Sequence, residues 1–166
     1  MEPAERRKIN SILSENFSEL DFATEALLIP IVLPQRTFLE KIFLLHEEFS
    51  QVPEKVRISR LSRHLYDLEK LMDTPHGIAA LQNKDLYKNI VSHREKFNPL
   101  VGLDYGNHRP EKIRIIPPDT VIKEYERDYS EMAKFMIYVE ALTFDRLKKR
   151  ISELQERVNK STNTKK

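Results

Sequence analysis

A stripe of apolar residues that recur every three or four positions constrains the fold most. The stripe comprises Ile58, Leu61, Leu65, Leu68 and Met72. This spacing places all of its members on one narrow face of an α-helix. The segment before it, which we expect to form a helix over about 38–50, has a broader apolar face. Each face needs a partner to be buried, so we predict that helices over 37–50 and 58–72 pack against each other.

Capping signals predict where several helices begin. Thr37 and Glu40 form a T-x-x-E capping box, in which each side chain satisfies a backbone donor left free at a helix start. Asp119 is placed to cap a long helix that continues to Tyr138, and Thr143 is placed to cap a final helix. We therefore expect helices to start beside each of these residues.

The first thirty residues predict two short elements. Helical spacing of apolar residues between Pro3 and Asn16 indicates an opening helix, because proline suits a first helical turn. The apolar run at 27–33 predicts a buried strand. Pro30 removes one hydrogen-bond donor from that strand, so we expect it at a sheet edge or at a bulge.

The remaining patterns complete a mainly α prediction. Helices are expected near 78–81 and over 85–97, and a short strand is expected at 113–116. The expected fold is a helical bundle-like domain of about six or seven helices with one or two short strands. We expect one domain over 1–160 and a disordered tail over 161–166.

The composition limits the classes of function. Lys and Arg number 28 against 26 Asp and Glu, and this formal net charge of +2 is far from the surplus that by itself suggests nucleic-acid binding. Any phosphate-binding surface must therefore be local. The chain has no cysteine, and its longest apolar run is far shorter than the roughly 20 residues that span a bilayer. We expect a cytoplasmic protein without a membrane segment.

Two motifs on consecutive expected helices point to a family. The first spans Arg36 to Lys41 (RTFLEK), and the second spans Arg60 to Leu68 (RLSRHLYDL). Later stretches at 93–97 and 116–118 follow in the same order. Together they resemble the C-terminal part of AbiEii/AbiGii nucleotidyltransferases, the toxins of abortive-infection and toxin-antitoxin systems. The resemblance covers nearly the whole chain.

The resemblance implies two catalytic residues. Lys41 and Asp67 match the lysine and the aspartate of the family's later pair of motifs. A lysine on a rigid helix can hold a fixed positive charge beside phosphates, and the aspartate can orient that lysine or the acceptor hydroxyl. Without the resemblance, Lys41 would be interpreted as a solvated helix lysine near Glu48.

The same motifs supply the expected substrate-binding residues, which are Arg36, Arg60, Arg63 and His64. The last three fall, with Asp67, within one sector of a helix opposite the apolar stripe, a surface suited to phosphate or RNA. Spacing alone favours an ordinary exposed face in which Arg63 and Asp67 form an i,i+4 pair.

No motif predicts a metal site. His46 lies on the apolar face of its helix, so we expect a buried histidine that is hydrogen-bonded within the core. His76, His93 and His108 show no ligand spacing with one another. The tyrosines do not interleave with basic residues as a base-stacking platform would, so we expect them to be mostly packing residues.

The departure from the family concerns the metal-binding half. The family's N-terminal half carries a Gly-Ser motif and an Asp-x-Asp pair that binds magnesium and a nucleoside triphosphate, and this sequence contains neither motif. We therefore expect Mg²⁺ and a nucleoside triphosphate only in the complete enzyme, no cofactor in this chain alone, and no activity of the chain by itself.

The expected partners follow from the same resemblance. They are the N-terminal nucleotidyltransferase half, an antitoxin protein, an RNA acceptor and a second copy in a homo-oligomer. A module that joins another domain should expose apolar surface around 27–33. The alternative function is a non-catalytic helical module that binds a protein or RNA through Arg60, Arg63 and His64.

Overall fold

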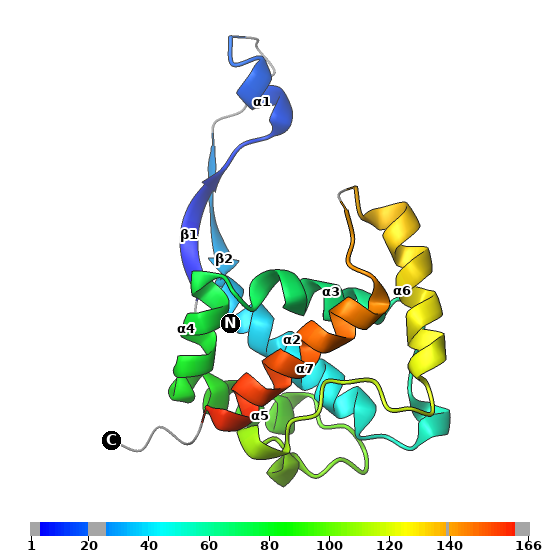
Figure 1. Ribbon diagram of the computed structural model, residues 1–166. Helices are drawn as coiled ribbons and strands as arrows, with labels where there is room; N and C mark the ends of the chain where they lie inside the picture. Colours follow the sequence, from blue (N-terminus) through cyan, green and yellow to red (C-terminus); the bar gives the residue numbers. More distant parts are fainter. Residues whose placement is uncertain (1–3, 20–25, 139, 162–166) are drawn as a thin grey trace.

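Seven α-helices and a two-stranded sheet make up the part of the chain that the computed structural model describes, residues 4–19, 26–138 and 140–161. In chain order the elements are β1 (Ala4–Ile9), α1 (Ile12–Asn16), β2 (Leu27–Val32), α2 (Pro34–Phe49), η1 (Pro53–Lys55), α3 (Ser62–Leu71), α4 (Pro75–Gln82), α5 (Lys84–Phe97), η2 (Tyr105–Asn107), η3 (Pro110–Lys112), α6 (Ile122–Met136) and α7 (Phe144–Lys160). Helices α2 to α7 form the body, from which the two strands project as a hairpin with α1 at its outer end (Figure 1). A helical content of 62% confirms the expected mainly α fold.

Helix α2 lies at the centre of the body, in contact with α3, α4 and α5 (Figure 1). Its broad apolar face accounts for this place, because ten of its sixteen residues are buried. The helix begins at Pro34, which suits a first turn because proline lacks the N–H group that a helix start leaves unpaired. The capping-box prediction is therefore wrong, since Thr37 and Glu40 lie inside the helix.

Helix α3 begins at Ser62, later than the apolar stripe predicts. Arg60 has a φ of 62°, a left-handed conformation that stops a right-handed helix from extending back towards Ile58. Asp128 of α6 satisfies the free donors at this point. Its Oδ1 accepts from the N–H of Arg60 at 2.7 Å, and its Oδ2 accepts from the N–H of Ser62 at 3.1 Å. The start of α3 thus depends on a helix that is distant in sequence.

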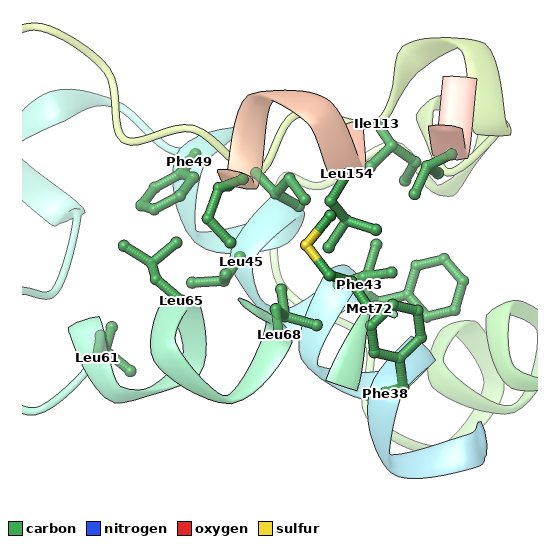
Figure 2. Close-up of a cluster of buried hydrophobic side chains, with 14 of the residues drawn as sticks. Phe38, Phe43, Leu45, Phe49, Leu61, Leu65, Leu68, Met72, Ile113 and Leu154 are labelled. Carbon is green, nitrogen blue, oxygen red and sulfur yellow. The ribbon is translucent and has the colours of Figure 1, made fainter. Parts of the chain in front are cut away.

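The core forms where the apolar stripe of α3 meets α2 and α7. Figure 2 shows Phe38, Phe43, Leu45 and Phe49 of α2, Leu65 and Leu68 of α3, Met72 just after it, and Leu154 of α7. All of these side chains are buried. The predicted packing of the two consecutive amphipathic helices is confirmed.

The segment at 113–116 buries alternate residues but is not the expected strand. Ile113 and Ile115 are fully enclosed. The N–H of Ile115 donates to Oε1 of Gln155 on α7 at 2.8 Å. A side chain therefore satisfies this backbone group, which in a sheet would pair with a neighbouring strand.

The opening segment forms strand β1, and the expected helix is limited to α1. β1 pairs antiparallel with β2, with Ala4 opposite Val32 and Ile9 opposite Leu27. Backbone pairing with β2 has prevailed over the helical spacing of the apolar residues. β2 is an edge strand, as Pro30 predicts, but it is not buried, since Leu27 is 66% exposed.

Helices α6 and α7 differ in how they begin. Thr143 caps α7 as predicted, because its hydroxyl accepts a hydrogen bond from the N–H of Arg146. Asp119 does not cap α6. A turn closed by the N–H of Val121 and the carbonyl of Pro118 separates Asp119 from the first helical residue. α6 also ends at Met136, before the expected end at Tyr138.

Two further expectations concern the ends of the chain and membranes. The expected tail at 161–166 lies outside the described residues except for Ser161, which ends α7. Within the described part of the chain, every helix is too short or too polar to cross a membrane.

Candidate functional site

Lys41 of α2 and Asp67 of α3 meet at the surface of the body. The ammonium nitrogen of Lys41 donates to Oδ2 of Asp67 at 2.8 Å and lies 3.3 Å from Nδ1 of His64. His64 and Asp67 are three residues apart on α3, so they share one side of that helix. The side chains of Lys41 and Asp67 remain 20% and 38% exposed. A ligand can therefore reach the pair.

The ionisation of His64 determines how Lys41 is held. Burial, followed by the positive charges of Lys41 and Arg63, lowers the pKa of His64 from 6.5 to about 4. The ring is therefore neutral at pH 7. Only its unprotonated nitrogen can face an ammonium group, so Nδ1 accepts from Lys41 and Nε2 carries the proton. A carboxylate and a ring nitrogen thus fix the ammonium in place.

A cleft of about 350 Å³ opens beside Lys41. Its lining residues are Val32, Arg36, Thr37, Glu40, Lys41, Leu44, His64 and Arg94. Three lysine or arginine side chains and one carboxylate line the cleft itself, and two of these cations, Lys41 and Arg94, also pair with Asp67 and Glu47. Such a cleft favours an anionic ligand.

Arg94 of α5 lies in the stretch at 93–97 that carries part of the resemblance, but it was not among the expected site residues. It donates to Glu40 and, through Nε, to Oε1 of Glu47 at 2.7 Å. His108 donates through Nε2 to the same oxygen of Glu47 at 3.1 Å. Burial acts to raise the pKa of Glu47, but the hydrogen bonds from Arg94 and His108 hold that pKa below its ordinary value. The ionised carboxylate fixes Arg94 at the cleft wall.

The comparison with protein-family models decides the family. Residues 1–152 match the family described as nucleotidyl transferase AbiEii toxin, type IV toxin-antitoxin system. The chain belongs to this family. The match confirms the resemblance expected from the motifs and supports a nucleotidyltransferase-type function in a toxin-antitoxin system. No curated protein and no solved structure matches the chain.

The structure brings the expected site residues together only in part. Those that line the cleft or contact Lys41 are Arg36, Lys41, His64 and Asp67. Arg60 and Arg63 do not line it. Arg60 precedes the first turn of α3 in a left-handed conformation, so the helical face that was expected to group it with His64 does not extend that far.

The structure also differs from the two interpretations that rested on spacing alone, a solvated Lys41 near Glu48 and an Arg63–Asp67 pair. Glu48 is buried and pairs with Arg57 rather than lying near Lys41. Asp67 pairs with Lys41, whereas an i,i+4 pair with Arg63 had been expected. Contacts between helices have replaced contacts within one helix. Spacing along a single helix could not predict them.

His46 lies in the core, as its place on the apolar face predicts. It is 2% exposed, and its Nδ1 accepts from the N–H of Arg114 at 3.2 Å. Burial and, second, the electrostatic effect of the neighbouring His108 lower the pKa of His46 to about 4. Its role is therefore to satisfy a backbone donor as a neutral ring.

The carboxylates around the cleft are paired with cations. Magnesium needs free carboxylate oxygens. Glu40 already accepts from Arg36 and Arg94, and Asp67 accepts from Lys41. Among residues 4–19, 26–138 and 140–161, no group of three or more His, Asp or Glu side chains could hold a metal ion. The groups of the cleft that could contact a ligand are therefore its cations, Arg36, Lys41 and Arg94, which suit an anionic ligand.

Proposed function

We propose that this chain provides the helical side of an AbiEii nucleotidyltransferase site, in which Lys41 contacts the phosphates of a nucleoside triphosphate. The observation that carries the proposal is the ammonium of Lys41, fixed between Asp67 and His64 beside a cleft that also contains Arg36 and Arg94. A fixed cation stabilises phosphate oxygens as negative charge builds on them. It needs no rearrangement during the reaction.

The chemistry of nucleotidyl transfer explains why such a cation is useful. An acceptor hydroxyl attacks the α-phosphorus and loses its proton, a new P–O bond forms, and the bond to pyrophosphate breaks. Negative charge moves onto the pyrophosphate, and Lys41 is placed to compensate it. Because Asp67 is occupied by Lys41 at 2.8 Å, we assign it to positioning the ammonium rather than to removing the proton of the acceptor.

The magnesium and its carboxylates are assigned to an N-terminal nucleotidyltransferase half with the family's Asp-x-Asp pair. Pairing of Glu40 and Asp67 with cations supports this assignment. The hairpin is the proposed contact surface for that half, because Leu27 and Leu28 are 66% and 54% exposed and Val32 of the same strand lines the cleft. An antitoxin protein and an RNA acceptor are further proposed partners, in keeping with a toxin-antitoxin family.

Reconstitution tests this function. The chain should be incubated with magnesium, labelled nucleoside triphosphates and RNA, alone and together with or fused to the nucleotidyltransferase half. The chain alone should not label RNA, whereas the reconstituted protein should. Loss of a fixed cation at a transition state costs on the order of a hundredfold or more in rate. Lys41→Ala and Asp67→Ala should cause such losses without changing helix content.

A matched control separates a local effect from a general loss of charge. Lys123 is exposed on α6 and does not line the cleft. Lys123→Ala should leave the rate unchanged. Strong labelling by the chain alone would contradict the assignment of the metal ligands to another half. A reconstituted enzyme that is indifferent to substitution of Lys41 and Asp67 would contradict their proposed roles.

A further inference from the structure

A second cavity, which we call the α5 cavity, lies between α5 and the segment at 105–110. Its volume is about 440 Å³. Its lining residues are Leu81, Lys84, Tyr87, Lys88, Val91, Ser92, Tyr105, Gly106, His108, Arg109, Pro110 and Ser161. None of them lines the Lys41 cleft. Its volume falls within the range of cavities that hold small ligands.

The rim of the α5 cavity is positively charged. Lys84, Lys88 and Arg109 are exposed, and the lining includes no aspartate or glutamate. In the described part of the chain these three side chains form no ion pair and no hydrogen bond with another side chain. In a chain whose charges nearly balance, such a group of unpaired cations is a local feature. It favours an anionic group at the mouth of the cavity.

The walls of the α5 cavity are aromatic and apolar. Tyr105 stacks on His108 with ring centroids 4.7 Å apart and planes 15° apart, so one face of the tyrosine ring is covered. The hydroxyl of Tyr105 donates to the carbonyl of Asn98 at 3.2 Å. Tyr105 therefore offers the cavity an apolar ring rather than a free hydroxyl. An aromatic ring of this kind suits a flat ligand.

Tyr87 makes the opposite part of the lining rigid. Its hydroxyl donates to the carbonyl of His108 at 2.8 Å, and its ring meets Phe43 edge to face at 4.8 Å. Burial raises the pKa of Tyr87, so the phenol stays neutral. Hydrogen bonds from both tyrosine hydroxyls to backbone carbonyls hold the walls in place. A ligand would therefore enter a preformed cavity with little ordering of side chains.

We propose that the α5 cavity binds a nucleotide, with the base against Tyr105 and Tyr87 and the phosphate at Lys84, Lys88 and Arg109. The aromatic walls suit a flat apolar group, and the basic rim suits an anionic group. A ligand that fits both therefore carries a flat ring next to a negative charge. A free nucleoside monophosphate and an unpaired nucleotide of single-stranded RNA share that chemistry. The site goes beyond the proposed transferase function, because binding here needs neither Lys41 nor a second half.

Calorimetric titration of the full chain tests the proposal. The probes are nucleoside monophosphates, ribose 5-phosphate, inorganic phosphate and an unstructured RNA tetranucleotide. Nucleotide, RNA or both should bind saturably, and loss of base stacking should make ribose 5-phosphate and inorganic phosphate bind at least about tenfold more weakly. Binding by the RNA but not by the monophosphates would identify single-stranded RNA as the source of the nucleotide and would support the site.

Charge reversals at exposed positions locate the site without disturbing the core. Lys88→Glu and Arg109→Glu should each weaken binding at least about tenfold, because each replaces an attraction to phosphate with a repulsion. Lys123→Glu, a matched reversal on exposed α6, should have no effect. Lys41→Ala should retain the binding that Lys88→Glu and Arg109→Glu weaken, and any binding that it does remove is assigned to the Lys41 cleft.

The base contact has its own pair of variants. Tyr105→Phe keeps the ring and should retain binding of nucleotide, whereas Tyr105→Leu removes the ring and should weaken it. Three results would overturn the proposal. They are no binding at millimolar ligand, equal affinity for inorganic phosphate and nucleotide, and binding that Lys41→Ala abolishes while Lys88→Glu and Arg109→Glu retain it.

Discussion

Acidification from pH 7 to pH 5 should destabilise the fold through two buried histidines. Burial is the main cause that lowers the pKa of both His46 and His64 from 6.5 to about 4. The second cause is the neighbouring His108 for His46 and the positive charge of Lys41 for His64. In the unfolded chain both groups titrate near 6.5. As the pH falls through that value, the unfolded state binds protons that the folded state excludes. The free energy of unfolding therefore decreases.

The pKa values set the size of the effect. A group with a pKa of 6.5 in the unfolded state and about 4 in the folded state lowers the free energy of unfolding by about 2 kcal/mol between pH 7 and pH 5. His46 and His64 together should lower it by about 4 kcal/mol, a large part of the roughly 5–15 kcal/mol typical of a domain. Glu47 adds to the loss mainly below its ordinary pKa of 4.5, outside this window.

Urea unfolding followed by circular dichroism at pH 7 and pH 5 measures this loss. His46→Gln and His64→Gln keep a hydrogen-bond acceptor but remove the titrating ring, so each should abolish about half of the pH dependence. His76 is exposed on α4, and His76→Gln should keep all of it. A loss below about 1 kcal/mol in the unsubstituted chain, or an undiminished loss in the double variant, would refute the reasoning.

Three further substitutions test the fold, each by the free energy of unfolding. Arg60→Gly should stabilise by about 1 kcal/mol, because glycine adopts the left-handed conformation without steric cost, and destabilisation would contradict the assigned backbone. Asp128→Ala should destabilise by about 2–3 kcal/mol, since it removes the acceptor at the start of α3, whereas Glu126→Ala on the exposed side of α6 should change little. Leu68→Ala should destabilise by about 2–5 kcal/mol, and a comparable effect of Leu27→Ala would contradict the exposure of the hairpin.

Periodic patterns in the sequence predicted the helices that bury one face. The stripe at Leu65 and Leu68 predicted the packing of α3, and Thr143 predicted the start of α7, because both depend on residues close together in the chain. The start of α3 could not be predicted in this way. It depends on Asp128, 66 residues beyond Ser62, and on the left-handed backbone at Arg60.

The candidate site was predictable where the family motifs reach it. The motifs named Lys41, Asp67 and His64, and the structure places these side chains in contact. Spacing alone paired Asp67 with Arg63 because it considers one helix at a time. The place of Arg94 at the cleft was missed for the same reason, since its partners Glu40 and Glu47 lie on α2 rather than on its own helix.

The junction between the hairpin and the body has a mechanical consequence. Strand β2 ends at Val32 and helix α2 begins at Pro34, so Leu33 is the only residue between them. Proline fixes one backbone angle at this joint, and α2 is anchored by its buried face. The hairpin is therefore joined to the body at α2 through a connection of one residue. Val32 lines the Lys41 cleft, so a change in the angle of the hairpin would alter the wall of that cleft.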